Sequence, residues 1–141
     1  MRKLTINAQD IVFAWQDECL DNAYYLDIES GDTRLVNRNL LELGDLTDEI
    51  ERDLERFLYI PKPDKNLLID DLKEFAFTIE DSSLKNILPL AFESPDPVAA
   101  FKKILERSPR DRARLDAFIR ASLLARVDRW LKANAIDAEF V

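Results

Sequence analysis

The residues of this 141-residue chain that could do chemistry are mostly carboxylates, because it contains 28 Asp and Glu residues and no histidine. Without an imidazole, histidine-based acid–base catalysis, serine–histidine or cysteine–histidine nucleophiles and nearly all zinc sites are excluded. Any enzyme activity would have to use carboxylates, either alone or holding a hard cation such as Mg²⁺ or Ca²⁺. We therefore predict a protein that is not an enzyme, with no catalytic residue, no metal site and no cofactor.

The most suggestive carboxylate cluster is Asp70, Asp71 and Glu74, in which Asp70 and Glu74 share a helix face at i and i+4. A chain this rich in acids forms such clusters often, so we interpret this one as a solvated helix face. The single cysteine, Cys19, is predicted to lie on the apolar side of a first helix. A buried thiol of that kind is an inert apolar group, so we predict no nucleophile there.

Charge is unevenly distributed along this acidic chain, whose net charge is −8 at pH 7. Residues 1–98 hold 22 acidic and 10 basic side chains, whereas residues 99–135 hold 4 acidic and 10 basic ones. This asymmetry is consistent with ordinary variation of solvated faces, with packing of the two regions within or between chains, or with nucleic-acid contact. In the last interpretation the basic 102–132 stretch contacts phosphates, and the candidate binding residues are Lys102, Lys103, Arg107, Arg110 and Arg114.

The elements that position these side chains are predicted to be mostly helices, because apolar residues recur at helical spacing and only two glycines occur. We expect residues 1–141 to form one compact, mostly α domain with about six helices. The predicted helices cover about 8–20 and the stretch from Gly44 to Ile60, and others begin at Asp64, Ser82 or Ser83, Asp96 and Ser108. Pro89 should kink or shorten the fourth helix. The buried stripe of the second helix is predicted to be Ile50, Leu54, Phe57 and Leu58.

One small β-hairpin is expected near residues 24–36. Tyr24, Leu26 and Ile28 alternate with polar residues, turn-forming residues follow around Gly31, and the chain alternates again to Val36. Because an isolated hairpin is marginally stable in water, its apolar face is expected to lie on the helices.

The last helix, from Ser108 to about Asn134, is apolar over more of its circumference than one stripe. Such a helix is either the central helix of its domain or a self-association surface. The candidate self-association residues are Phe118, Leu123, Val127 and Trp130.

Several stretches together resemble a family of small acidic bacterial proteins that is described only as uncharacterised. They are Tyr24–Val36, the Phe57–Pro61 stretch with the helix that follows it to Phe75, Ala99–Leu105 and Trp130–Lys132. This chain departs from the family at Ser94–Pro97, where the family tends to have glycines, and at Ile104, where a second aromatic residue is usual. The resemblance implies a single α-rich domain of bacterial type and supplies no activity.

No segment has the apolar length of a signal peptide or a membrane span, so we expect a cytoplasmic protein without membrane association. Our first hypothesis is a non-enzymatic interaction domain that forms a homo-oligomer or binds a protein partner. The alternative is a nucleic-acid-associated protein, for binding or processing, that uses the basic stretch.

Overall fold

A computed structural model describes residues 1–37 and 43–141, with side chains for all of these except residues 43–47. Contacts within the chain divide it into two compact units. Unit 1 comprises residues 1–63 and 123–141, and unit 2 comprises residues 64–122. The long helix α6 (Pro109–Ala133) begins in unit 2 and ends in unit 1.

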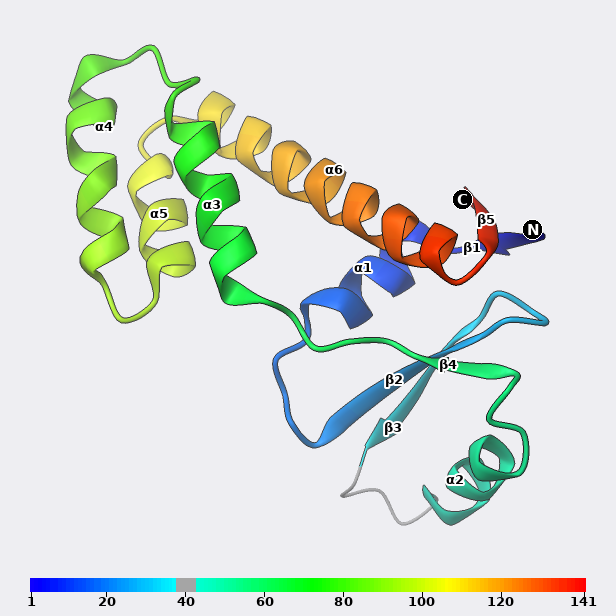
Figure 1. The fold of residues 1–141 in the computed structure, drawn as a ribbon. Helices are drawn as coiled ribbons and strands as arrows, with labels where there is room; N and C mark the ends of the chain where they lie inside the picture. The colour runs from blue at the N-terminus through cyan, green and yellow to red at the C-terminus, as the bar shows by residue number, and fades with distance from the viewer. Residues whose placement is uncertain (38–42) are drawn as a thin grey trace. The chain divides into compact units, whose positions relative to one another are not determined.

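Unit 1 combines two small sheets with two helices and the last part of α6 (Figure 1). Its other elements are β1 (Arg2–Ile6), α1 (Ala8–Gln16), β2 (Asn22–Asp27), β3 (Thr33–Asn37), α2 (Leu43–Arg52), β4 (Phe57–Tyr59) and β5 (Ile136–Phe140). Strands β1 and β5 form a parallel pair, which brings the two termini of the chain together. The second sheet is antiparallel, in the order β3-β2-β4.

The core of unit 1 lies between the sheets, α1 and the last part of α6. Period-2 alternation in β1 buries Leu4 and Ile6 while Lys3 and Thr5 face solvent, as expected for a strand with one covered face. The fully buried side chains that join them are Ile11, Leu26, Val127 and Leu131. Asn7 starts α1 by accepting the backbone N–H of Asp10 at 3.0 Å.

Unit 2 is helical. Its elements are α3 (Lys65–Ala76), α4 (Ser82–Ile87), the 3₁₀ helix η1 (Leu88–Glu93), α5 (Pro97–Leu105) and the first part of α6. The side chains of Asp64, Asp81 and Asp96 accept backbone N–H groups at the starts of α3, α4 and α5. Helix α4 lies beside α5 (Figure 1), and the largest fully buried side chains between the helices are Leu72, Phe75, Leu88, Phe101, Leu105 and Leu115.

The prediction of a mostly α fold with one small hairpin is wrong, because the described residues form five strands in two sheets. The hairpin itself is present as β2 and β3. Strands β1 and β5 were missed because each has five residues and its partner lies at the other end of the chain. Strand β4 was missed because Phe57 and Leu58 were assigned to a helix, whereas Phe57 pairs with Asp27 and Leu58 with Leu26.

Cys19 also differs from its prediction, since it is exposed rather than buried on a helix. Helix α1 ends at Gln16, because Asp17 has extended backbone angles and its side chain accepts the N–H of Cys19 at 2.9 Å. Such local side-chain bonds compete with helix continuation. Among the residues that the structure describes, no helix is long and apolar enough to cross a membrane.

Candidate functional site

The five basic residues predicted to contact nucleic acid do not line one cavity. Lys103 and Arg107 line a groove formed by the end of α4, η1 and α5. Arg110 and Arg114 line a separate polar cavity beside the start of α6. Lys102 lines neither of them. All five belong to unit 2. Two of them line the groove and two others line the polar cavity, so the five do not form one basic surface.

The groove has a volume of about 560 Å³ and a mostly apolar floor. Its lining residues are Ile87, Leu90, Ala91, Ala100, Lys103, Ile104, Glu106 and Arg107. Two of them are alanines, one from η1 and one from α5, and their short side chains leave room between these segments. Leu90 is 61% exposed, so a large apolar side chain stands open to solvent at the groove.

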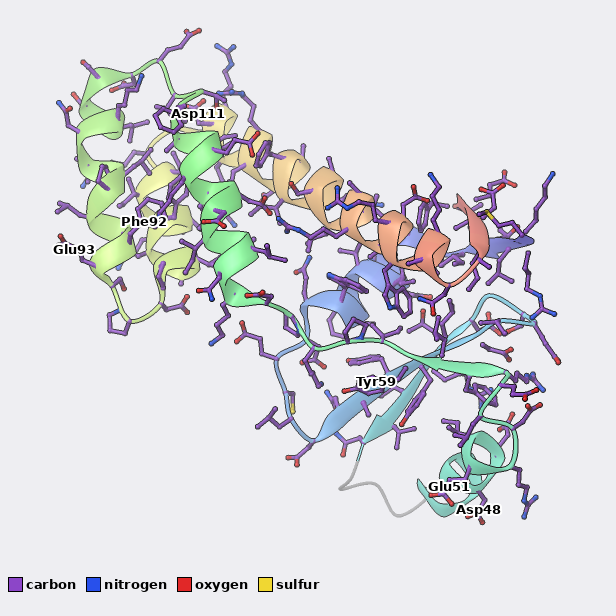
Figure 2. The ribbon with its side chains drawn as sticks, in the orientation of Figure 1. Asp48, Glu51, Tyr59, Phe92, Glu93 and Asp111 are labelled. Carbon is purple, nitrogen blue, oxygen red and sulfur yellow. The ribbon has the colours of Figure 1, made fainter. Side chains whose placement is uncertain are left out.

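The local sequence explains why this groove forms. Pro89 cannot donate a helical hydrogen bond, so α4 stops at Ile87 and the chain continues as the tighter helix η1. Asp96 and Pro97 then start α5, which returns along η1. Phe92 packs with its ring centre 5.9 Å from that of Phe101, which holds η1 against α5, and Figure 2 shows Phe92 beside the neighbouring Glu93.

Two cations stand at the groove. Lys103 lies in the last turn of α5 and Arg107 lies two residues after its end, and both side chains are exposed. The backbone N–H groups of Glu106 and Arg107 donate to the carbonyls of Lys103 and Ile104 at 3.2 and 3.4 Å, which ends the helix. Cations also stabilise the negative end of a helix dipole. Lys103, in the last turn of α5, therefore stabilises the helix as well as lining the groove. Glu106 adds one negative charge to the same lining.

The second cavity has a volume of about 340 Å³. Several of the polar side chains that line it form hydrogen bonds with one another. Asp111, labelled in Figure 2, accepts from Ser108 Oγ at 2.9 Å and from Arg114 Nη1 at 2.7 Å. Arg114 Nη2 donates to Thr78 Oγ1 at 2.9 Å. The hydroxyl of Ser108, together with Arg114, lowers the pKa of Asp111 below its ordinary value.

We interpret this network as structural, because it ties the residues after α3 to the first turn of α6. Another carboxylate at the cavity, Asp81, accepts the N–H groups of Ser83 and Leu84 as the cap of α4. Among the side chains that the structure describes, in residues 1–37 and 48–141, no group of three or more His, Cys, Asp or Glu could hold a metal ion. The groove is therefore the candidate site.

The four candidate self-association residues pack to different degrees within the chain. Val127 is fully buried in the core of unit 1, and Leu123 is 6% exposed. Trp130 is half-buried and meets the ring of Trp15 edge to face at 5.4 Å. Phe118 is half-buried in unit 2, with its ring 5.4 Å from that of Phe75.

An exposed acidic turn was missed by the sequence analysis. Leu54 was assigned to the buried stripe of a helix, but α2 ends at Arg52 and Leu54 is 67% exposed. The N–H of Asp53 donates to Ile50 and that of Arg56 donates to Asp53, which closes the turn before β4. Phe57, Leu58 and Tyr59 include aromatic residues that favour strands, and this composition could have indicated that the helix ends before them.

The sequence profile of one family, the Uncharacterised protein family (UPF0158), matches residues 1–141. The chain belongs to this family, which confirms the predicted resemblance to an uncharacterised family. No curated protein and no solved structure matches the chain.

Proposed function

We propose that this member of UPF0158 is a protein-interaction domain whose groove on unit 2 binds an acidic, leucine-containing segment of a protein partner. The observation that carries this proposal is an apolar groove with an exposed leucine, Leu90, and two exposed cations, Lys103 and Arg107. An apolar side chain entering the groove is removed from water, and carboxylates beside it meet the cations.

The groove suits an anchoring side chain in size and composition. Its volume of about 560 Å³ lies within the roughly 300–1,000 Å³ of typical ligand-binding cavities. Full burial of one leucine contributes about 1.5–3 kcal/mol. The exposed cations contribute mainly to the association rate and to the choice of partner. Together these terms favour a weak and specific complex.

A nucleic-acid partner is less favoured by the same residues. Phosphate recognition needs several cations on one surface, and here the candidate cations are divided between two cavities. Glu106 lies in the groove, and Glu80, Asp81 and Asp111 lie in the other cavity, where they would repel phosphates. Binding of an oligonucleotide is therefore an outcome to be tested and not our proposal.

The test is an NMR titration of the full ¹⁵N-labelled chain with a synthetic peptide that has one central leucine flanked by Asp and Glu. We expect shifts concentrated at Leu90, Ala100, Lys103 and Arg107. A matched peptide with alanine in place of leucine, and another with lysine in place of the acids, should each bind at least about tenfold more weakly.

Two variants assign the binding to the groove. Leu90→Asp should abolish peptide binding and leave the fold intact, because Leu90 is already exposed. Arg120→Glu is the matched charge control, since Arg120 is exposed on α6 and does not line the groove, and it should bind as the wild type does. Shifts elsewhere, no shifts, or preferential binding of a single- or double-stranded oligonucleotide would overturn the proposal.

A further inference from the structure

We infer that the segment bound by this groove belongs to a second copy of the same chain, and that it is the turn carrying Leu54 in unit 1. This inference rests on the proposed function of the groove. It also names the partner, because the chain itself displays a segment of the required chemistry.

The turn presents one apolar side chain amid acids. Leu54 is 67% exposed, and its neighbours Asp53 and Glu55 are both exposed. Two further exposed carboxylates, Asp48 and Glu51, lie on the preceding helix α2 (Figure 2). An exposed leucine surrounded by acids is complementary to an apolar groove whose lining includes Lys103 and Arg107.

Charge distinguishes this turn from Leu20, another strongly exposed leucine among the side chains of unit 1 that the structure describes. Leu20 is 79% exposed, and acidic residues lie near it in the sequence. However, Lys62 Nζ donates to the carbonyl of Cys19 at 2.9 Å and also to that of Asn22, so a cation sits on the loop of Leu20. Residues 48–55 contain five carboxylates and one arginine, and one of the carboxylates, Glu49, pairs with Arg34 at 3.2 Å, while the following Arg56 is bound by the buried Asp27. Four carboxylates, Asp48, Glu51, Asp53 and Glu55, thus remain around Leu54, against Asp17, Glu18 and Asp21 around Leu20. The Leu54 turn is the more acidic partner for a groove with exposed cations.

The turn is also held in place before it binds. Arg56, two residues after Leu54, is fixed by two hydrogen bonds to the buried carboxylate of Asp27. The N–H of Ile28 donates to the carbonyl of Arg56 at 2.9 Å, which anchors the end of the turn to the β2–β3 hairpin. A preorganised segment loses less conformational entropy on binding than a flexible one.

When two copies bind through unlike surfaces, the assembly can be a closed dimer or an open chain of copies. If each copy inserts its turn into the groove of the other, the product is a two-fold symmetric dimer. If the geometry prevents this reciprocity, the contact continues from copy to copy. Both products require one intact turn and one intact groove at every contact.

Sedimentation velocity of the full chain, over low to high micromolar concentrations, tests the inference. We expect the wild type to associate, and Leu54→Asp and Leu90→Asp each to weaken association at least about tenfold, as expected for loss of one buried leucine. An equimolar mixture of these two variants should form a heterodimer that neither variant forms alone, because the intact groove of Leu54→Asp can bind the intact turn of Leu90→Asp. The second contact of that pair has neither an intact groove nor an intact turn, so the heterodimer should be weaker than the wild-type complex and should not grow further. Leu20→Asp is the matched control and should associate like the wild type.

Folding of each variant is checked by its thermal unfolding midpoint at a concentration low enough for the wild type to be monomeric, where the midpoint should not change because these leucines are exposed. A wild type that stays monomeric, or a mixture of Leu54→Asp and Leu90→Asp that forms no heterodimer, overturns the inference. If the chain is monomeric but the groove binds the acidic peptide, the proposed function stands and only the second copy is wrong. If the peptide does not bind, the proposed function fails as well.

Discussion

The carboxylate of Asp27 binds the guanidinium of Arg56 through two hydrogen bonds, from Nε to Oδ1 at 3.0 Å and from Nη2 to Oδ2 at 2.7 Å. Oδ1 also accepts the backbone N–H groups of Glu29 and Ser30, at 2.9 and 3.3 Å. One buried side chain thus fixes both the turn of the β2–β3 hairpin and the residues that follow Leu54. Arg56 is the main cause that lowers the pKa of Asp27 below its ordinary value.

Removing this carboxylate should therefore be costly. Asp27→Ala is expected to lower the free energy of unfolding by about 1.5–3 kcal/mol, because it removes charge-assisted hydrogen bonds from a buried carboxylate while Arg56 remains partly exposed to water. Glu29→Ala removes only an exposed carboxylate at 3.5 Å from Arg56 Nε and should cost less than about 1 kcal/mol. Urea unfolding of both variants measures the difference. Equal losses would show that the Asp27 pair does not stabilise the hairpin.

Tyr24 should make stability depend on pH in alkali. Burial, together with the hydrogen bond that its hydroxyl donates to Asp17 at 2.6 Å, raises the pKa of Tyr24 from 10.0 to about 12. Between these values the folded state keeps a proton that the unfolded chain releases, so the free energy of unfolding falls as pH rises. Urea midpoints from pH 10 to 12 should fall less steeply in Tyr24→Phe than in the wild type. Parallel slopes in the two proteins would contradict this assignment.

Gly31 should tolerate no side chain. Its φ is +85°, and a Cβ built there would lie 2.1 Å from the backbone oxygen of Thr5 in β1. Gly31→Ala is expected to lower the free energy of unfolding by about 2–5 kcal/mol, from the left-handed conformation together with the overlap. Gly31→Asn should be nearly as destabilising, because asparagine eases the conformation but keeps the Cβ. If Gly31→Asn were as stable as the wild type, the overlap of a Cβ with the backbone oxygen of Thr5 would not be a cause of the destabilisation in Gly31→Ala.

Salt should weaken association of the chain to a moderate extent. Between about 0.1 and 1 M salt the screening length falls from about 10 to about 3 Å, which removes attraction between exposed charges. With a few exposed pairs worth roughly 0.2–1 kcal/mol each, we expect a three- to tenfold loss of self-association. Sedimentation at several salt concentrations measures it. An unchanged or stronger association at high salt would show that the acidic turn does not meet Lys103 and Arg107.

Several helices and the hairpin could be predicted from residues that are neighbours in the sequence. The starts of α5 and α6 follow from the Asp96-Pro97 and Ser108-Pro109 pairs, because a polar cap followed by proline is a preferred helix start. The hairpin followed from alternation in Tyr24–Val36 around a turn. Pro89 correctly indicated the end of α4. These features depend on neighbours in the chain, which a sequence displays directly.

The rest depends on contacts between distant residues. Arg2 pairs with Ile136 only because the fold brings the two ends together, and neither short strand predicts its partner. Lys103 and Arg107 were named from the sequence as candidate binding residues, but the hollow that Ala91 and Ala100 line depends on how η1 packs against α5. Leu54 was misassigned because a helical spacing continued past the true end of α2.

The most direct measurement is a dilution series of the ¹⁵N-labelled wild-type chain, followed by NMR from high to low micromolar concentration. We predict that two sets of amide signals move together, one at the groove around Leu90 and Lys103 and the other at the turn around Leu54, whereas those around Leu20 stay fixed. Signals that do not move on dilution, or that move at only one of the two surfaces, would contradict the pairing of groove and turn.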